Sequence, residues 1–237
     1  MGLPPPHGVP MKRLVLVLPL ILTACVVTSS EVPPEGWVEL QGDGLEGWIG
    51  GTTFDPQKLV EMDASERAEL EAGWTAEVAE HWRVDGDELV SDGHGPHLVT
   101  AAEYGDFELE LEWKILPGGD SGVYLRGYPQ VQLWDPWNEA AHVHGSDKGS
   151  GGLWNNDVHE RWPALVADNT PGSWNHMRLV MQGSEVWVVL NGHPIVEGVE
   201  LDNYFRRGEP LLERGPIHLQ THGSEVRFRN VRVRPLD

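Results

Sequence analysis

The fold class is decided by one stretch of alternating residues, Phe107-Glu108-Leu109-Glu110-Leu111-Glu112-Trp113-Lys114-Ile115. Apolar side chains occupy every second position of this stretch, and charged side chains occupy the positions between them. Because successive side chains of a strand point to opposite faces, the alternation predicts a strand with one buried face in an antiparallel sheet.

Shorter runs on both sides of this stretch repeat the strand pattern, separated by turn residues such as Asn191-Gly192. The predicted strands are 37–40, 82–84, 88–91, 97–100, 107–115, 122–126, 131–134, 174–181, 185–190, 217–220 and 226–234. One helix is predicted within 56–72, with Asp55 as its N-cap and Gly73 as its stop. The pattern predicts an all-β protein, a two-sheet antiparallel jelly-roll sandwich with a short helical insertion.

Residues 1–25 have the features of an export leader. Met11 is followed by two basic residues and an apolar run over 14–22, which is too short to span a bilayer. Leu22-Thr23-Ala24-Cys25 resembles the lipobox of bacterial lipoproteins, in which the cysteine is lipidated. We therefore expect translation to start at Met11 and a lipid anchor at Cys25 in the bacterial cell envelope; an ordinary secretory signal is the alternative.

Residues 26–36 are interpreted as a linker and 37–237 as a single jelly-roll domain. The chain has 37 acidic residues against 17 Lys and Arg, a net charge of -20. This charge excludes nucleic acid as a partner and leaves the lipid anchor as the membrane contact. Cys25 is the only cysteine, so the chain forms no internal disulfide and has no thiol for catalysis.

A candidate ligand site lies on the predicted strand at 217–220 and just beyond it. His218, Gln220 and His222 point to one side, and the intervening Ile217, Leu219 and Thr221 point to the other. Solvated strand faces usually carry Lys, Glu or Thr. The His-Gln-His pattern therefore indicates a polar binding site.

Motifs along nearly the whole mature chain resemble the 3-keto-disaccharide hydrolase family, formerly a domain of unknown function. The most specific is Gly118-Gly119-Asp120-Ser121-Gly122-Val123-Tyr124-Leu125-Arg126-Gly127. The others lie at 36–40, 45–48, 104–107, 131–135, 148–156, 172–175, 191–192, 219–223 and 228–230. The resemblance implies a concanavalin A-like jelly roll, as in lectins and glucanases, that acts on sugars oxidised at C3.

A ketone at C3 acidifies the C2 proton, so a base can form an enolate and the C1 oxygen can leave. Water then adds to complete a net hydrolysis. This reaction needs a base that titrates near neutrality, groups that bind oxygen and a surface for the sugar ring. The expected catalytic residues are His222, Arg126, Asp135 and Glu112. The expected substrate-binding residues are Gln132, Trp134, Tyr124, Trp154, Asn155, His218 and Gln220.

Several of these residues have a second interpretation. Arg126 could equally form a structural ion pair with Glu110 or Glu112, and the acids at 108, 110 and 112 could be a glucanase-like pair or a solvated strand face. No cofactor is expected, although His142 and His144 would share a face, and could share a divalent metal, if their segment is extended.

The predicted function is a hydrolase or lyase acting on 3-keto-glycosides, with a separate sugar 3-oxidase supplying the ketone. A non-catalytic carbohydrate-binding module of the same fold is the main alternative. A glucanase-like glycosidase or a scaffold lipoprotein is the third.

The lipobox-like motif generates a test. We expect Cys25→Ala to move the protein from the membrane fraction to the soluble fraction or to leave it unprocessed, with the domain still folded, because the lipid would be the membrane contact. Fractionation and mass spectrometry of the wild-type protein provide the measurement. Recovery of wild-type mature protein without lipid from the soluble fraction would contradict the anchor.

Overall fold

The computed structural model describes residues 1–2 and 36–236. The predicted apolar run, Cys25 and all of the linker except Gly36 lie outside the described residues. No helix in the described part of the chain is long and apolar enough to cross a membrane.

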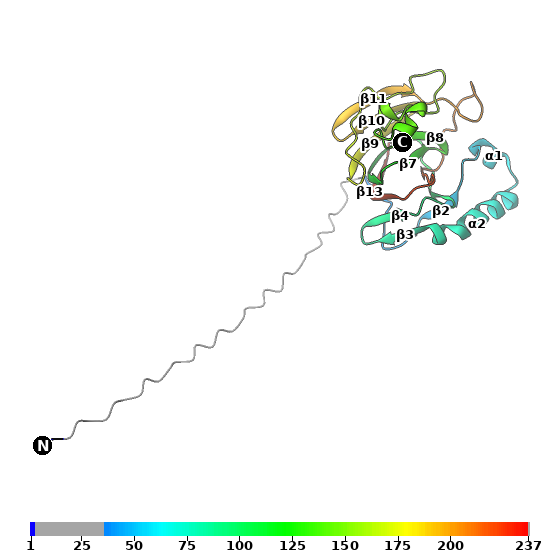
Figure 1. Ribbon diagram of the computed structural model, residues 1–237. Coiled ribbons are helices and arrows are strands. Elements are labelled where there is room, and N and C mark those ends of the chain that lie inside the picture. The colour runs from blue at the N-terminus through cyan, green and yellow to red at the C-terminus, as the bar shows by residue number, and fades with distance from the viewer. Residues whose placement is uncertain (3–35, 237) are drawn as a thin grey trace. The chain divides into compact units, whose positions relative to one another are not determined.

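Strands of the described residues form two antiparallel sheets, which confirms the predicted jelly-roll sandwich (Figure 1). The larger sheet has the order β11-β10-β9-β6-β13-β4-β3, with β1 also paired to β13. Its strands are β1 (Val38–Glu39), β3 (Trp82–Asp85), β4 (Glu88–Ser91), β6 (Phe107–Ile115), β9 (Asn175–Gln182), β10 (Glu185–Leu190), β11 (His193–Glu200) and β13 (Val226–Pro235).

The smaller sheet has the order β2-β5-β12-β7-β8. Its strands are β2 (Trp48–Gly51), β5 (His97–Thr100), β7 (Asp120–Leu125), β8 (Tyr128–Trp134) and β12 (His218–Leu219). Two short 3-10 helices follow β8, namely η1 (Glu139–His144) and η2 (Ser146–Lys148).

The core lies between the two sheets and is built from the alternating apolar residues. Leu109 and Leu111 of β6 and Val123, Leu133 and Leu219 of the smaller sheet are at most 1% exposed. Burial of such side chains is the main favourable contribution to folding, about 1.5–3 kcal/mol each. The alternation that predicts the fold thus gives each sheet one face in the core.

The acidic face of β6 forms a ladder of ion pairs instead of a glucanase-like site. The register places Glu108, Glu110 and Glu112 opposite arginines of β13. Glu112 accepts from Arg229 (2.8 Å) and Glu110 from Arg232 (2.9 Å), and Glu108 pairs with Arg234. Glu112 therefore stabilises the pairing of β6 and β13 and is not a catalytic residue of the pocket described below.

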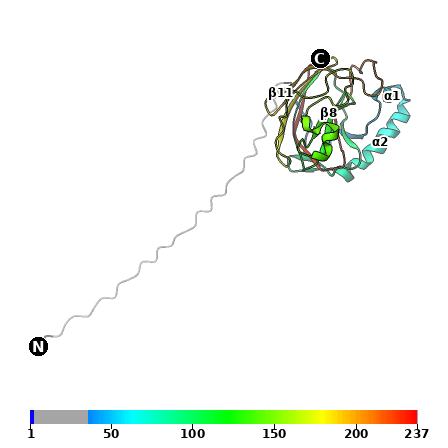
Figure 2. The same cartoon turned by 45° about the horizontal axis from the view of Figure 1, so that its top comes forward.

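Two helices fill the predicted insertion and lie together along one flank of the sandwich (Figures 1 and 2). They are α1 (Pro56–Glu61) and α2 (Ala64–His81). Asp55 caps α1 as predicted, because its side chain accepts from Gln57 N at 3.0 Å. The predicted stop at Gly73 is wrong, since α2 continues to His81. A glycine costs about 1 kcal/mol in a helix. Contacts beyond Gly73 offset this cost, because Thr75 Oγ1 accepts from Gly50 N (3.0 Å) and Val78 is buried.

Two strands have no counterpart in the sequence prediction. β2 ends in Gly50-Gly51 and β11 contains Pro194, and both residue types weaken a strand signal. Each strand lies at one end of its sheet order, where proline and glycine are tolerated best. Pairing with a neighbouring strand forms these strands, and the local sequence does not reveal it.

Candidate active site

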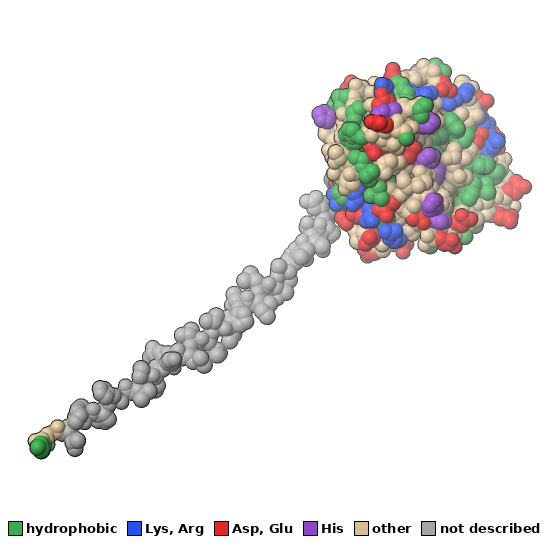
Figure 3. All heavy atoms as spheres, viewed as in Figure 1, with side chains coloured by type: hydrophobic (Ala, Val, Ile, Leu, Met, Phe, Trp, Pro, Cys, Tyr) green, Lys and Arg blue, Asp and Glu red, His purple; other side chains and the backbone are tan. Residues whose placement is uncertain are grey.

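The outer face of the smaller sheet carries polar side chains on adjacent strands. The register pairs His218 with both Val99 and Tyr124, and Gly122 with Gln132. Since paired residues share a face, Tyr124, Gln132, His97, His218 and Gln220 lie on the face opposite the core. Figure 3 shows histidine side chains (purple) gathered along the middle of one face of the molecule.

A pocket of about 350 Å³ opens on this outer face. Seven of the predicted site residues line it: Tyr124, Gln132, Trp134, Trp154, Asn155, Gln220 and His222. The side chains that the sequence analysis did not assign to the site are Thr53, Asp120, Pro129, Gln130, Ala141, His144 and Tyr204. The structure thus brings together residues that lie far apart in the sequence, from Thr53 to His222.

Asp120 and His222 form an acid-base pair at the edge of this pocket. His222 Nδ1 lies 3.4 Å from Asp120 Oδ2. The hydrogen bond and charge of Asp120 raise the pKa of His222 despite partial burial. When Nδ1 carries the proton toward the carboxylate, Nε2 is the basic nitrogen.

The carboxylate of this pair is itself held by glutamines. Gln132 Nε2 donates to Asp120 Oδ1 at 2.6 Å, and Gln130 Nε2 donates to Gln132 Oε1. Gln132 is 3% exposed, so its amide is fixed in the floor of the pocket. This series of contacts, from Gln130 through Gln132 and Asp120 to His222, orients the imidazole from the floor of the pocket.

His218 and His97 are buried beside Tyr124 and differ in character from His222. The rings of His218 and Tyr124 stack with centroids 5.3 Å apart, and His97 meets Tyr124 edge-on at 5.1 Å. Burial lowers the pKa of His218 to about 3 and that of His97 to about 4. Both imidazoles are therefore neutral near pH 7, and neither lines the pocket of His222.

Tyr124 and Gln220 provide neutral hydrogen-bonding groups in the pocket. Gln220 Nε2 donates to Tyr124 Oη (3.2 Å), which also bonds Thr53 Oγ1 (2.7 Å). Burial raises the pKa of Tyr124 to about 12, so its hydroxyl keeps its proton. Gln220 Oε1 is buried without a hydrogen-bond partner among the described residues, which is uncommon for a buried acceptor.

Trp134 and Trp154 form one wall of the pocket, with their rings edge-to-face at 6.3 Å. Trp134 is only 4% exposed, and its Nε1 donates to Gly149 O at 2.8 Å. Trp154 is half-buried, and its Nε1 donates to His144 O at 3.0 Å. Trp154 therefore offers more ring surface to a ligand than Trp134, which packs against the Trp154 ring.

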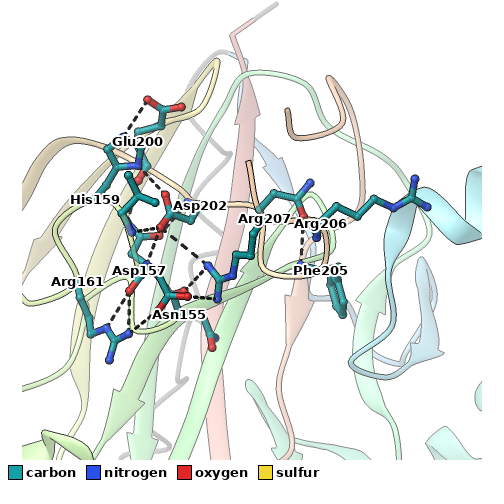
Figure 4. A network of polar contacts seen from close by, with 12 residues as sticks. Asn155, Asp157, His159, Arg161, Glu200, Asp202, Phe205, Arg206 and Arg207 are labelled. Atoms are coloured by element: carbon teal, nitrogen blue, oxygen red, sulfur yellow. Dashed lines mark hydrogen bonds and ion pairs between the residues drawn. The ribbon is translucent and has the colours of Figure 1, made fainter. Parts of the chain in front are cut away.

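A polar network fixes the loop that carries Trp154 and Asn155 (Figure 4). Arg207 Nη1 donates to Asn155 O at 2.9 Å, and Asp202 accepts from the backbone N–H groups of Asp157 (2.6 Å) and Val158 (2.7 Å). The network ties this loop to the segment that carries Tyr204. Both sides of the pocket mouth are thus set by tertiary contacts.

Arg126, an expected catalytic residue, does not line this pocket and makes structural contacts. Its guanidinium donates to Gly105 O (2.8 Å) and Gly183 O (2.9 Å) and pairs with Asp106 (2.8 Å). The side chain is 4% exposed and ties loops together, because several buried carbonyl oxygens need donors there. The predicted alternative partners, Glu110 and Glu112, instead bond arginines of β13.

Asp135 is also structural and does not line the pocket. Its carboxylate accepts from Gly118 N at 2.8 Å and from Trp137 N at 2.9 Å. The bond from Trp137 closes the turn after β8, and the bond from Gly118 ties this turn to the loop between β6 and β7. Both oxygens are committed to backbone donors, so the expected acid-base role of Asp135 is not supported.

The segment with His142 and His144 is a 3-10 helix and not extended, so the condition for a shared face is not met. His142 Nε2 bonds Pro136 O at 3.0 Å, whereas the exposed His144 lines the pocket. Within residues 1–2 and 36–236, no group of three His, Cys, Asp or Glu side chains could hold a metal ion.

Residues 36–234 match the family model described as the 3-keto-alpha-glucoside-1,2-lyase-like domain. The chain belongs to this family. A 3-keto-disaccharide hydrolase of Bacteroides thetaiotaomicron is 23% identical over 262 residues, which cover 91% of this chain and 84% of that protein.

Two crystal structures from Parabacteroides distasonis, each of a candidate glycosyl hydrolase, share the fold. One has a TM-score of 0.61 at 23% identity, and the match covers 84% of this chain and 99% of that chain. The other has a TM-score of 0.60 at 24% identity, and the match covers 86% of this chain and 85% of that chain. These likenesses support the two-sheet architecture.

The two tryptophans generate a prediction that separates binding from stability. Trp154→Ala should weaken disaccharide binding by roughly 1–2 kcal/mol with a nearly unchanged melting temperature, because its ring borders the pocket. Trp134→Ala should lower the free energy of unfolding by about 3 kcal/mol, because its ring is enclosed. Ligand titration and urea unfolding measure the two effects, with the half-exposed Trp137→Ala as the control. Equal effects of the first two variants on stability would contradict the assignment.

The buried histidines predict an acid-sensitive fold. Their pKa values are about 3 and about 4 when folded, against 6.5 for an unperturbed histidine, so below pH 6.5 the unfolded chain binds more protons. The contribution of the two neutral histidines to the free energy of unfolding is therefore fully present above pH 6.5. It is lost progressively as the pH drops toward 4. Between pH 7.5 and pH 5 the loss should reach up to about 2 kcal/mol for each histidine. Urea unfolding of His218→Phe should show a smaller loss over this range than the wild type; an identical loss would contradict the prediction.

Proposed function

We propose that this protein is a glycosidase-like enzyme that cleaves 3-keto-glycosides by elimination and hydration, with His222 as the base. The observation that carries the proposal is the Asp120–His222 pair in a pocket of about 350 Å³ with aromatic walls. Membership of the 3-keto-alpha-glucoside-1,2-lyase-like family and the likeness to a 3-keto-disaccharide hydrolase support it.

The proposed reaction begins when His222 Nε2 removes the proton from C2 of the sugar. The electron pair moves toward the C3 ketone to form an enolate. The enolate then returns to the ketone, and its electron pair forms the C1–C2 double bond as the C1–O bond breaks. The leaving alcohol takes up a proton. Water adds to C1 and a proton returns to C2, so the net result is hydrolysis with the ketone retained.

Asp120 has two functions in this proposal. Its hydrogen bond and its charge raise the pKa of His222, which makes the imidazole a stronger base and stabilises the imidazolium formed by proton transfer. Its hydrogen bond also favours the tautomer with Nε2 available. The bond from Gln132 keeps the carboxylate in place while His222 changes charge.

The neutral side chains are proposed to bind the sugar. Trp154 provides a face for the ring, and Gln220 Oε1 is the unsatisfied acceptor for a sugar hydroxyl. Tyr124 keeps its proton, so its hydroxyl can exchange hydrogen bonds without competing as a base. The pocket thus combines the Asp120–His222 pair with uncharged binding groups.

The setting of the reaction is also part of the proposal. A 3-keto-glycoside must be formed by oxidation of the C3 hydroxyl, and a separate sugar 3-oxidase would supply it. The lipobox-like motif at Cys25 supports an envelope location, where exported glycosides meet the enzyme.

The acid-base pair predicts the pH dependence. The value of kcat/KM on a 3-keto-α-glucoside should rise with pH through an apparent pKa above 6.5, because His222 must lose its proton to act and Asp120 raises its pKa. In Asp120→Asn this rise should move to lower pH while the plateau falls at least about 10-fold. His222→Gln should lose about 100-fold or more at every pH, with the exposed His193→Gln as the matched control. An unshifted profile in Asp120→Asn would rule out the proposed pair.

Isotope incorporation tests the elimination step itself. In D₂O, elimination and hydration place one deuterium at C2 of the released keto-sugar, whereas direct displacement at C1 leaves that position unlabelled. Mass spectrometry and NMR of the product distinguish the two. Binding of 3-keto-glycosides without any turnover by the wild type would instead favour a carbohydrate-binding module.

A further inference from the structure

A second cavity lies on the same sheet face, between the sheet and the helical insertion, and is not used by the proposed chemistry. Its volume is about 110 Å³. Ile49 and Val99 of the sheet, Leu59 of α1 and Trp74 of α2 contribute to its walls. The pair Phe54 and Trp74, with ring centroids 5.8 Å apart, adds an aromatic surface.

The two cavities are neighbours across a stacked pair of rings. Tyr124 lines the pocket of His222, and His218 lines the second cavity. Their rings are parallel within 10° and 5.3 Å apart. Thr53 lines the first pocket, while Thr52 and Phe54 on either side of it line the second. The two buried rings therefore separate the cavities.

His218 gives the cavity a neutral polar edge. A Cβ atom at Gly51 would lie 3.8 Å from His218 Cε1, and one at Gly127 would lie 3.9 Å from His218 Nε2. Both glycines line the cavity, so the Cε1–Nε2 edge of the ring borders it. His218 Nδ1 is buried without a hydrogen-bond partner among the described residues. Burial lowers the pKa of this imidazole to about 3, so it is neutral.

The charged residues of the cavity are engaged with one another. Arg67 pairs with Glu71 at 2.8 Å and with Glu103 at 3.3 Å, and Arg214 donates to Glu103 O at 2.9 Å. A charged ligand would have to compete with these contacts and desolvate beside a neutral histidine. An uncharged ligand with one hydroxyl avoids both costs, because a hydroxyl can donate to or accept from Nε2 in either tautomer.

The volume limits the size of the ligand. Engineered apolar cavities of about 150 Å³ bind benzene, so a cavity of about 110 Å³ with an open side suits a single ring. We propose that this cavity binds an uncharged aromatic alcohol of one ring. The binding of the ring does not depend on the proposed function.

Titration of the full chain with phenol tests the site directly. Methyl NMR signals of Ile49, Leu59 and Val99 should shift with a dissociation constant in the millimolar range, as expected for so small a ligand. Benzoate, which adds a charge to the same ring, should bind at least about 10-fold more weakly. Absence of phenol shifts at these methyls, or equal binding of benzoate, would overturn the proposal.

Two substitutions separate the cavity from the hydroxyl contact. Ile49→Phe should fill the cavity and weaken phenol binding at least about 10-fold, whereas Val158→Phe, at an 81% exposed position away from it, should not. His218→Phe should keep the stacked ring but lose Nε2, so phenol binding falls about 5-fold while toluene binding is retained. Unchanged phenol binding in Ile49→Phe or equal losses of phenol and toluene in His218→Phe would contradict the assignment.

Asp120→Asn serves as a control in the neighbouring pocket, because Asp120 does not line the cavity. This variant should lose activity on 3-keto-glycosides and still bind phenol as the wild type does. Loss of phenol binding in Asp120→Asn would contradict a site separate from the pocket of His222.

Discussion

The smaller sheet depends on one constraint: its strands must send alternate side chains into the core. Val123, Leu133 and Leu219 are completely buried against the other sheet, so the residues between them are forced outward. A shift of one residue in any of these strands would place polar side chains such as Gln132 in the core. The same burial that stabilises the sandwich therefore positions the floor of the candidate site.

The residues on this outer face fall into two electrostatic classes. Asp120 and His222 lie at the strand ends, where exposure lets them carry charge and exchange protons. His97 and His218 lie deeper in the face, where desolvation keeps them neutral. Identical side chains thus have different chemistry because the sheet places them at different depths.

The helical insertion and the long loops provide the walls that turn this open sheet face into two pockets. The segment of α1 and α2 covers one end of the face and forms the smaller cavity with His218. The loop that carries Trp154 and Asn155 encloses the other end and is held by Arg207 and Asp202. Both elements depend on contacts with residues distant in the sequence, so each pocket is a product of the whole fold.

The sequence by itself determined the sandwich and the outward side of its strands, because alternation is a local property. Phe107–Ile115 was predicted with its observed bounds, and the outward positions of His218 and Gln220 follow from the same rule. The resemblance to the family adds the expectation of a sugar site, yet it does not say which polar residues meet.

Only the tertiary structure decided the partners of each charged group. Asp120 reaches His222 because β7 and β12 are neighbours in the sheet, and no local pattern encodes that order. Three residues of catalytic type have structural partners instead. Arg126 donates to carbonyl oxygens, Asp135 accepts from backbone amides, and Glu112 pairs with an arginine of the neighbouring strand. Hydrogen bonding and ion pairing depend on distance in space, which is why sequence patterns predicted the faces of the strands and not the contacts of the site.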